Sequence, residues 1–339
     1  MAKQLLQGNE AVALAARHAG MSFFASYPIT PASEILHALI DTDVTVVQME
    51  DEIASINAAI GASLAGAKVM VATSGPGFSL MQESIGLAHM METPMVVVDV
   101  QRVGPSTGMP TLPAQGDVLQ ARYGSHGDYF PIIFYPNSVA ELYEYTFKAF
   151  NAAEESRSPV VLLSDGFISH LYETAQLKSL KPSQRKKQAP LGTGNRHFTG
   201  LTRVKGVPAP SDSRVHSRMI RDMEKRHDRV AAKYTAYEYL ENPSSHVLVI
   251  SYGAMSRAVL SFADEYGLYR PIRMFPVIED LTEIAADYDV VVVAEMNAGQ
   301  YAYVVERIIN REVLCCSFVG GKLDLREIGK RLRDTVKRR

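Results

Sequence analysis

Short apolar runs alternate with longer amphipathic segments along most of the chain. Val96 to Val98 and Val290 to Ala294 are uninterrupted and rich in β-branched residues, which is typical of strands buried on both faces of a parallel sheet. The segments between such runs have the spacing of helices. This alternation predicts an α/β protein whose parallel sheets are covered by helices.

The first part of the chain, residues 1–180, carries most of these elements. We expect a helix over Gly8–Ala19 and strands at Ser22–Ser26, Val44–Val47 and Val69–Thr73. Ligands of parallel sheets bind beyond the carboxyl ends of the strands. The loops that follow these strands are therefore where we expect a functional site.

A change in composition then separates two domains. Residues 181–243 begin with a basic, proline-interrupted stretch, and we expect a linker followed by a helix from Met219 to Leu240. Residues 244–339 resume the alternation, with strands expected at His246–Ser251 and around Pro271–Phe275. This last part predicts a second, smaller α/β domain.

Composition and charge narrow the functional classes. The 339 residues are 47% hydrophobic and 21% charged, which excludes disordered, collagen-like and coiled-coil classes and suits two domains of roughly 100 to 200 residues. The net charge of −2 does not favour nucleic acid or a membrane surface as a partner. The basic stretch at 181–233 leaves nucleic-acid binding open as an alternative, but it lacks the aromatic residues on which bases stack. We expect a solvated crossover or a subunit contact there.

Two further features concern the cellular compartment and the sites that the cysteines could form. No apolar stretch of about 18 residues and no signal-peptide pattern occurs, so we expect a cytoplasmic protein that does not span a membrane. Cys315 and Cys316 are adjacent and have no other cysteine to join them, so the chain's thiols alone cannot build a four-thiolate iron–sulfur cluster, a CxxC pair or an all-thiolate zinc site.

Polar residues follow three of the predicted strands, and each group has an ordinary structural explanation. Glu50, Asp51 and Glu52 open a helix, where carboxylates gain from the helix dipole. Ser74 to Gly77 form a glycine-rich turn that matches neither the dinucleotide nor the P-loop pattern. Thr30 precedes a helix, where threonine commonly serves as a cap.

Longer motifs carry a resemblance to a known family. The four main motifs are YPITP at 27–31, QMEDEIASINAAIGASLAGAKV at 48–69, TSGPGFSLMQESIG at 73–86 and QRVGPSTGMPT at 101–111. Together they resemble the α subunits of 2-oxoacid:ferredoxin oxidoreductases, most closely the 2-oxoglutarate branch, which hold thiamine diphosphate in a pyrimidine-binding domain. Further matches, including QGDVLQARYGSHGD at 115–128 and AEMNAGQ at 294–300, extend the resemblance over nearly the whole chain.

The resemblance implies coenzyme A-dependent oxidative decarboxylation of a 2-oxo acid, with electrons passed to ferredoxin. Glu50 matches the carboxylate that hydrogen-bonds the pyrimidine N1′, a role that suits a buried group with a raised pKa. Arg102 matches an arginine that binds the substrate carboxylate, although a rim salt bridge or a subunit contact is the alternative. Thr30 is expected to donate one more hydrogen bond to the substrate, and His126 is a weaker candidate as a donor to the substrate or to a partner chain.

Several parts of such an enzyme are missing from this sequence. It has no cluster cysteines and no GDG-to-Asn pattern for Mg²⁺ and diphosphate. The resemblance assigns the Mg²⁺ and a [4Fe–4S] cluster to a separate β subunit, with γ and ferredoxin-like δ subunits as further possible partners, and it makes residues 244–339 a transketolase C-terminal-like domain. Two alternatives stay open: a branched-chain 2-oxo acid or pyruvate as substrate, and a non-catalytic scaffolding subunit.

Overall fold

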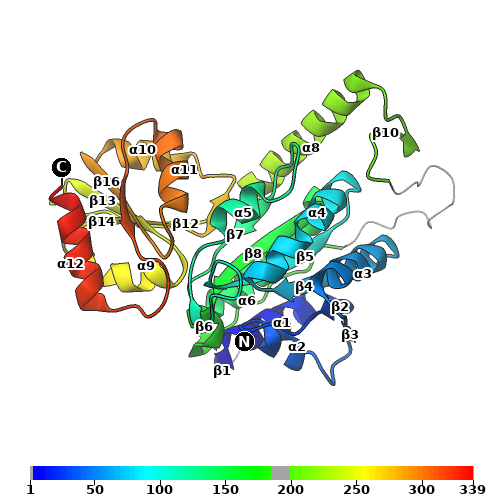
Figure 1. Ribbon diagram of the computed structural model, residues 1–339, viewed down its shortest axis with the longest axis horizontal. Coiled ribbons are helices and arrows are strands. Elements are labelled where there is room, and N and C mark those ends of the chain that lie inside the picture. The colour runs from blue at the N-terminus through cyan, green and yellow to red at the C-terminus, as the bar shows by residue number, and fades with distance from the viewer. Residues whose placement is uncertain (1–2, 185–198, 339) are drawn as a thin grey trace.

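The predicted α/β class is confirmed by the fold. The computed structural model describes residues 3–184 and 199–338, and within them strands and helices alternate as expected. Two mainly parallel sheets dominate, and each is covered by helices on both faces (Figure 1).

All strands of the larger sheet except β15 lie before residue 166. Its strand order is β15-β7-β8-β5-β4-β2-β3, with β6 paired to β5. The pairs from β7 to β3 are parallel, whereas β15 and β6 run antiparallel to their neighbours. The strands are β2 (Phe23–Ser26), β3 (Thr45–Gln48), β4 (Val69–Thr73), β5 (Met95–Val103), β6 (Met109–Pro113), β7 (Ile132–Phe134), β8 (Pro159–Asp165) and β15 (Arg273–Phe275).

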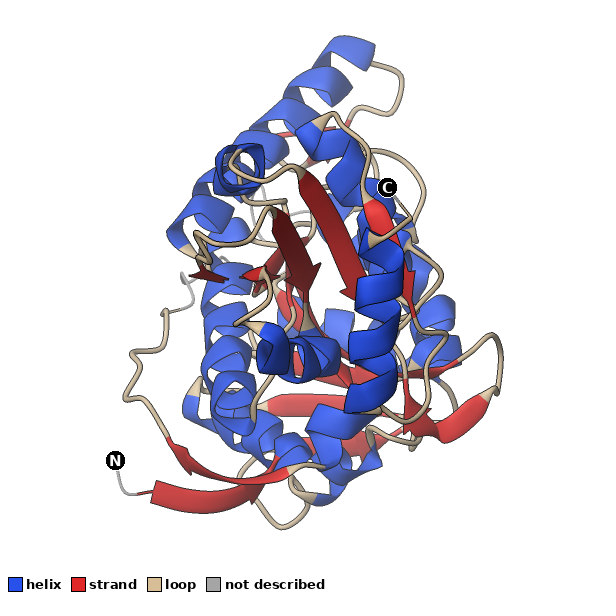
Figure 2. Ribbon diagram, turned by 90° about the vertical axis from the view of Figure 1, so that its left-hand side faces the viewer, coloured by secondary structure: helices blue, strands red, loops and turns tan. Residues whose placement is uncertain are grey.

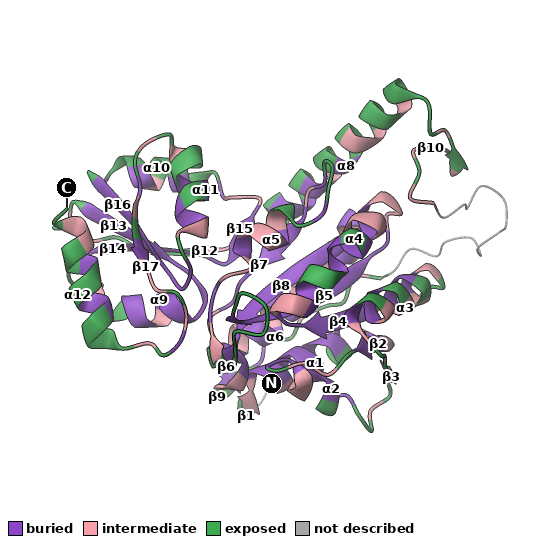
Figure 3. Cartoon of the chain, viewed as in Figure 1, coloured by how far each residue is buried: buried purple, intermediate pink, exposed green. Residues whose placement is uncertain are grey.

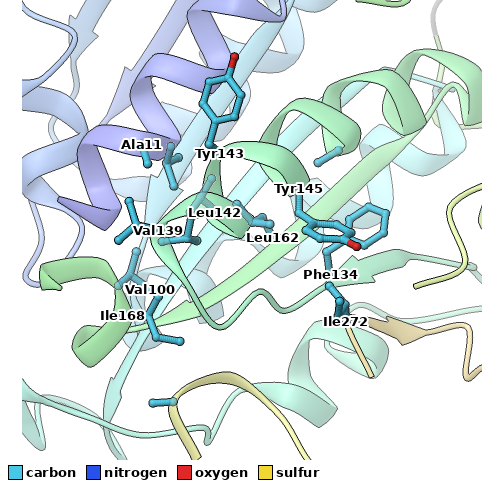
Figure 4. Close-up of a cluster of buried hydrophobic side chains, with 14 of the residues drawn as sticks. Ala11, Val100, Phe134, Val139, Leu142, Tyr143, Tyr145, Leu162, Ile168 and Ile272 are labelled. Atoms are coloured by element: carbon cyan, nitrogen blue, oxygen red, sulfur yellow. The ribbon is translucent and has the colours of Figure 1, made fainter. Parts of the chain in front are cut away.

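Helices pack on both faces of this sheet. Alternate strand residues divide between two apolar clusters: Val96 and Val98 pack with α1, α2 and α6, whereas Val97 packs with α3, α4 and α5. Figure 4 shows Leu142 and Tyr145 of α6 lying over the strands. The helices are α1 (Gly8–His18), α2 (Ser33–His37), α3 (Glu52–Leu64), α4 (Gly75–Met90), α5 (Val118–Tyr123), α6 (Val139–Ser156) and α7 (Gly166–His170).

The second sheet has the order β12-β14-β13-β16-β17 and is parallel except for β12. Helices α9 and α12 cover one face, and α10 and α11 cover the other. The elements are β12 (Tyr237–Leu240), β13 (Val247–Ser251), α9 (Gly253–Val259), the 3₁₀ turn η1 (Leu260–Phe262), β14 (Gly267–Pro271), α10 (Asp280–Ala286), β16 (Val290–Glu295), α11 (Gln300–Ile309), β17 (Leu314–Ser317) and α12 (Leu325–Val336).

Two sequence-based expectations need correction. The helix expected over Met219–Leu240 is α8 (Ser213–Lys233), and the residues after it form β12, because Tyr237 to Leu240 alternate in burial and pair with β14. The strand expected around Pro271–Phe275 divides in two: β14 ends at Pro271 in the second sheet, and β15 crosses to pair with β7 of the first. This crossing ties the two sheets together.

Part of the predicted linker, residues 185–198, lies outside the described residues. The hairpin of β10 (Arg203–Val204) and β11 (Val207–Pro208) follows, and the outer half of α8 projects from the body with its side chains exposed (Figure 3). Glu92 anchors this arm through ion pairs to Arg203 at 2.7 Å and Arg226 at 2.5 Å. None of the described helices is both long enough and apolar enough to span a membrane.

Side-chain hydrogen bonds join the first sheet's loops to the second sheet. The Gln115 amide donates to Tyr252 O at 2.7 Å and accepts from Met296 N at 2.8 Å, while Asn297 Nδ2 donates to Gln115 O at 2.7 Å. Strands β1 (Lys3–Gln7) and β9 (Tyr172–Gln176) form a separate antiparallel ribbon along one edge of the molecule (Figure 2).

Candidate cofactor and substrate site

Buried polar side chains gather where β4 and β5 end. Thr73 is the last residue of β4 and lies in register with Asp99 of β5. The hydroxyls of Thr73 and Ser74 are buried, and neither makes a hydrogen bond. Buried polar groups are normally satisfied, so this concentration of free hydroxyls marks a place where a polar ligand would complete the structure.

Of the three consecutive acidic residues Glu50, Asp51 and Glu52, Glu52 is the one whose carboxylate lies beside Thr73 at the end of β4. It is the first residue of α3 and only 5% exposed. Burial raises its pKa above the usual value, and the neighbouring charge of Asp51 adds to the effect. Asp51 itself caps α3 by accepting a hydrogen bond from Ala54 N at 2.7 Å, so the expected helix-start role is confirmed for Asp51.

Glu50 does not have the surroundings that its predicted role requires. The expectation was a carboxylate in a buried site, and the structure places Glu50 on the exposed surface of this chain. The backbone explains the difference, because the extended Asp51 precedes the first helical turn and only Glu52 lies within that turn. On its burial, Glu52 is therefore a better candidate than Glu50 for the hydrogen bond to the pyrimidine ring.

Arg102 and Thr30, which are far apart in sequence, are brought together. The Arg102 guanidinium donates to Thr30 O at 2.8 Å, and Asn9 Nδ2 holds the adjacent Pro31 O at 2.9 Å. Arg102 is 8% exposed, and its Nε makes no hydrogen bond. Thr30 is not a helix cap, because the residue that precedes α2 is Ala32, and the Thr30 hydroxyl bonds to no described residue.

A buried carboxyl pair, Asp99 and Asp117, lies beside these residues and was not anticipated as part of the site. Burial raises the pKa of both, to about 6 for Asp117 and well above its usual value for Asp99. The Asp117 backbone is held by Gln101 Oε1 at 2.9 Å. One signal was present in the sequence: Asp99 interrupts an otherwise apolar β-branched run.

His126 is not brought to the site by the described structure. It is exposed, and it lies beyond the C-terminal end of α5, whose N-terminal end begins next to Asp117. Its ring makes no hydrogen bond within the described parts of the chain. A role for His126 toward a partner chain stays a prediction.

The residues present fit the pyrimidine half of a thiamine cofactor. They supply a buried carboxyl with a raised pKa, two free hydroxyls and a strand-end arginine. Within residues 3–184 and 199–338, no cluster of three or more His, Cys, Asp or Glu side chains could hold a metal ion.

Because Gly77 has no side chain, the Glu52 carboxylate can occupy the space beside it, and a first prediction follows from this. A Cβ added at Gly77 would overlap Glu52 Oε1 and Thr73 Oγ1. Gly77→Ala should cost the assembled enzyme about 10²-fold in activity, because displacing a catalytic group by about 1 Å has effects of that size. Alanine is otherwise favoured over glycine within a helix by roughly 1 kcal/mol.

Gly61→Ala is the matched control, because Gly61 lies inside α3 and a Cβ there meets no atom within 4 Å. Thermal unfolding and steady-state rates of both variants should separate the two effects. Full activity in Gly77→Ala would show that Glu52 does not need its present position.

Comparison with known proteins is consistent with this geometry. The family described as "Pyruvate flavodoxin/ferredoxin oxidoreductase, thiamine diP-bdg" matches residues 14–238. The 2-oxoglutarate synthase subunit KorA of Methanocaldococcus jannaschii is 42% identical, covering 95% of this chain and 97% of its own length. The ketoisovalerate oxidoreductase subunit VorB of Methanothermobacter marburgensis is 34% identical, with 98% of each chain covered.

Solved structures agree. The 2-oxoglutarate:ferredoxin oxidoreductase of Magnetococcus marinus, with 2-oxoglutarate, coenzyme A and succinyl-CoA bound, has a TM-score of 0.89 at 30% identity; the match covers 98% of this chain and 65% of that one. A split-gene transketolase shares the fold alone, with a TM-score of 0.59 at 13% identity. The chain therefore belongs to the pyruvate flavodoxin/ferredoxin oxidoreductase family, as a relative of the α subunits of its 2-oxoacid:ferredoxin oxidoreductases.

Proposed function

We propose that this chain is the α subunit of a 2-oxoglutarate:ferredoxin oxidoreductase. The enzyme would convert 2-oxoglutarate and coenzyme A into succinyl-CoA and CO₂, pass electrons to ferredoxin, and run in reverse under reducing conditions, as a reductive citric acid cycle requires. The observation that carries the proposal is the joining of Glu52, Arg102 and Thr30 at one end of a thiamine-type sheet. Full-length similarity to 2-oxoglutarate synthase subunits supports the choice of substrate.

In this proposal Glu52, rather than the exposed Glu50, hydrogen-bonds the pyrimidine ring. A carboxyl with a raised pKa can share a proton with a ring nitrogen, whereas a fully solvated carboxylate is a poorer match. Bound thiamine diphosphate would supply the nucleophilic carbon and the electron sink. Glu52 would hold and return a proton at the ring nitrogen, while Thr73 and Ser74 offer hydroxyls beside it.

Arg102 and Thr30 would hold the substrate's 1-carboxylate. One guanidinium N–H, on Nη1, donates to Thr30 O, and Nη2 makes no hydrogen bond to the described residues, so a donor remains for a carboxylate. The Thr30 hydroxyl can add one hydrogen bond. Arginine suits this task because its planar fork matches a carboxylate better than a lysine does.

The remaining parts of the enzyme would come from other chains in the cytoplasm. A β subunit would provide the Mg²⁺ site for the cofactor's diphosphate and a [4Fe–4S] cluster, with γ and ferredoxin-like δ subunits as additional partners. Exposed apolar side chains of Ile53, Leu80 and Met109 near the site offer a surface for the β subunit.

Reconstitution tests the shared site. Coenzyme A-dependent viologen reduction should be absent for this chain alone and present when it is co-expressed with a β subunit, under anoxic conditions with thiamine diphosphate and Mg²⁺. No activity in a complex shown to contain cofactor and clusters would favour the scaffolding alternative. The similarity to ketoisovalerate oxidoreductase subunits makes a branched-chain 2-oxo acid the second candidate substrate.

A further inference from the structure

Asn9 is a fully buried polar residue in the first turn of α1, and the proposed reaction gives it no role. Its side-chain amide makes two hydrogen bonds: Nδ2 donates to Pro31 O at 2.9 Å and to Glu34 Oε2 at 3.1 Å. Both partners are acceptors, so the NH₂ group has to face them and the orientation of the amide is fixed. Asn9 therefore ties α1 to the loop that carries Thr30.

The start of α1 is itself closely held. A Cβ added at Gly8 would lie 2.2 Å from Ile168 O, so only glycine allows this approach of the helix end to α7. Gln7 N donates to Glu10 Oε2 at 2.8 Å, which closes a capping box at the first turn. The Asn9 amide thus projects from a helix end whose position is well defined.

Two neighbouring carbonyl groups of the Thr30–Pro31 segment are held by two different elements. Arg102, on β5, donates to Thr30 O at 2.8 Å, while Asn9, on α1, donates to Pro31 O. The backbone has only two soft dihedrals per residue, so a segment held at two successive carbonyls has little freedom to turn. The direction of the Thr30 side chain is therefore set by Arg102 and Asn9 together.

We propose that Asn9 is a positioning residue for binding of the substrate's 1-carboxylate. This inference rests on the proposed role of Arg102 and Thr30. Asn9 makes no contact with the carboxylate; by holding Pro31 O it directs the Thr30 hydroxyl toward the carboxylate that the Arg102 guanidinium binds. A loop held at Thr30 O alone would be free to turn, and the hydrogen bond from the hydroxyl to the substrate would be lost.

Binding of a substrate analogue by the assembled complex tests the proposal. The probe is N-oxalylglycine, an amide analogue of 2-oxoglutarate that has both carboxylates but no ketone to react, and its Kd is measured by calorimetry. Asn9→Ala should raise this Kd by roughly tenfold, the factor that corresponds to the loss of one hydrogen bond to a charged group. In steady-state assays, KM for the 2-oxo acid should rise by a similar factor while kcat changes by less than about threefold.

Asn242→Ala is the matched control, because Asn242 Nδ2 also donates to a backbone carbonyl, Ala263 O at 3.1 Å, in the second domain. This variant should leave the Kd unchanged. Asn9→Ser removes the amide but keeps a polar group and leaves space for a water molecule, so it serves if Asn9→Ala does not fold. It should raise the Kd by at least about threefold. Thermal unfolding of each complex shows which variants are folded.

A double-mutant cycle separates positioning from a general structural effect. Thr30→Val removes the hydroxyl, keeps the shape of the side chain and should itself raise the Kd by about tenfold. In the Thr30→Val background, Asn9→Ala should raise the Kd further by less than about threefold, because the hydrogen bond that it weakens is already gone.

The outcomes distinguish this inference from the proposed function. Additive effects of the two changes, or an unchanged Kd in folded Asn9→Ala or Asn9→Ser, would overturn the inference and leave the proposed function intact. An unchanged Kd in Thr30→Val, or no binding of the analogue to the unmodified complex, would count against the proposed substrate site and against this inference with it.

Discussion

Glu52→Gln should lower the turnover of the assembled complex by about 10²- to 10⁴-fold, the range expected for loss of a positioned acid–base group. Glutamine keeps the size of the side chain but cannot exchange a proton with a ring nitrogen. Glu52 is 5% exposed and burial raises its pKa, the direction that favours sharing a proton with a ring nitrogen. Replacing a buried carboxyl that has no ion-pair partner among the described residues with an amide of the same size should leave the unfolding temperature nearly unchanged.

Glu50→Gln is the matched control, because it makes the same chemical change two residues earlier on the exposed surface. It should keep at least half of the activity. The informative measurement is the steady-state rate of both variants, with cofactor content determined for each. Loss of activity in Glu50→Gln and its retention in Glu52→Gln would restore the assignment made from the sequence motif and reject the one made from burial.

Arg102→Ala should reduce kcat/KM for the 2-oxo acid by about 10²- to 10³-fold, mainly through a higher KM. Truncating one partner of a buried charge pair costs at least about 2 to 5 kcal/mol, and 1.4 kcal/mol corresponds to a factor of ten. Because Arg102 also balances the buried carboxyls, some loss of thermal stability is expected.

Arg102→Lys distinguishes substrate binding from simple charge balance. Lysine keeps the positive charge but loses the bidentate geometry, so stability should recover while KM stays high. Full recovery of KM in the lysine variant would mean that Arg102 contributes only its positive charge and does not bind the substrate's 1-carboxylate through a bidentate contact.

The fold was largely predictable because local pattern and final burial agree in it. Apolar runs such as Val69–Thr73 became strands with every residue buried. The two incorrect predictions concern segments that become strands only because a neighbouring strand is available to pair with them. Tyr237–Leu240 became a strand because β14 offers it an edge, and β15 joined the first sheet across the domain boundary. A periodicity argument made along one segment cannot show either pairing.

The site was predictable to within a few residues but not in its details. Arg102 and Thr30 were anticipated from motifs, and the structure brings them into contact. The acidic triplet was harder, because three consecutive carboxylates look alike in sequence and only the geometry of the helix start decides which one is buried. Asp99 and Asp117 come from segments 18 residues apart in numbering, and their proximity depends on how α5 is placed against β5.

The substrate assignment is tested most directly by one comparison of kcat/KM. The co-expressed complex, supplied with thiamine diphosphate, Mg²⁺ and coenzyme A, would be assayed by anoxic viologen reduction with 2-oxoglutarate, 2-oxoisovalerate and pyruvate. The account predicts a preference for 2-oxoglutarate of at least about tenfold, since a site that pairs the distal carboxylate discriminates against analogues that lack it. A higher kcat/KM for 2-oxoisovalerate or pyruvate would contradict it and would place the chain among the α subunits for that acid.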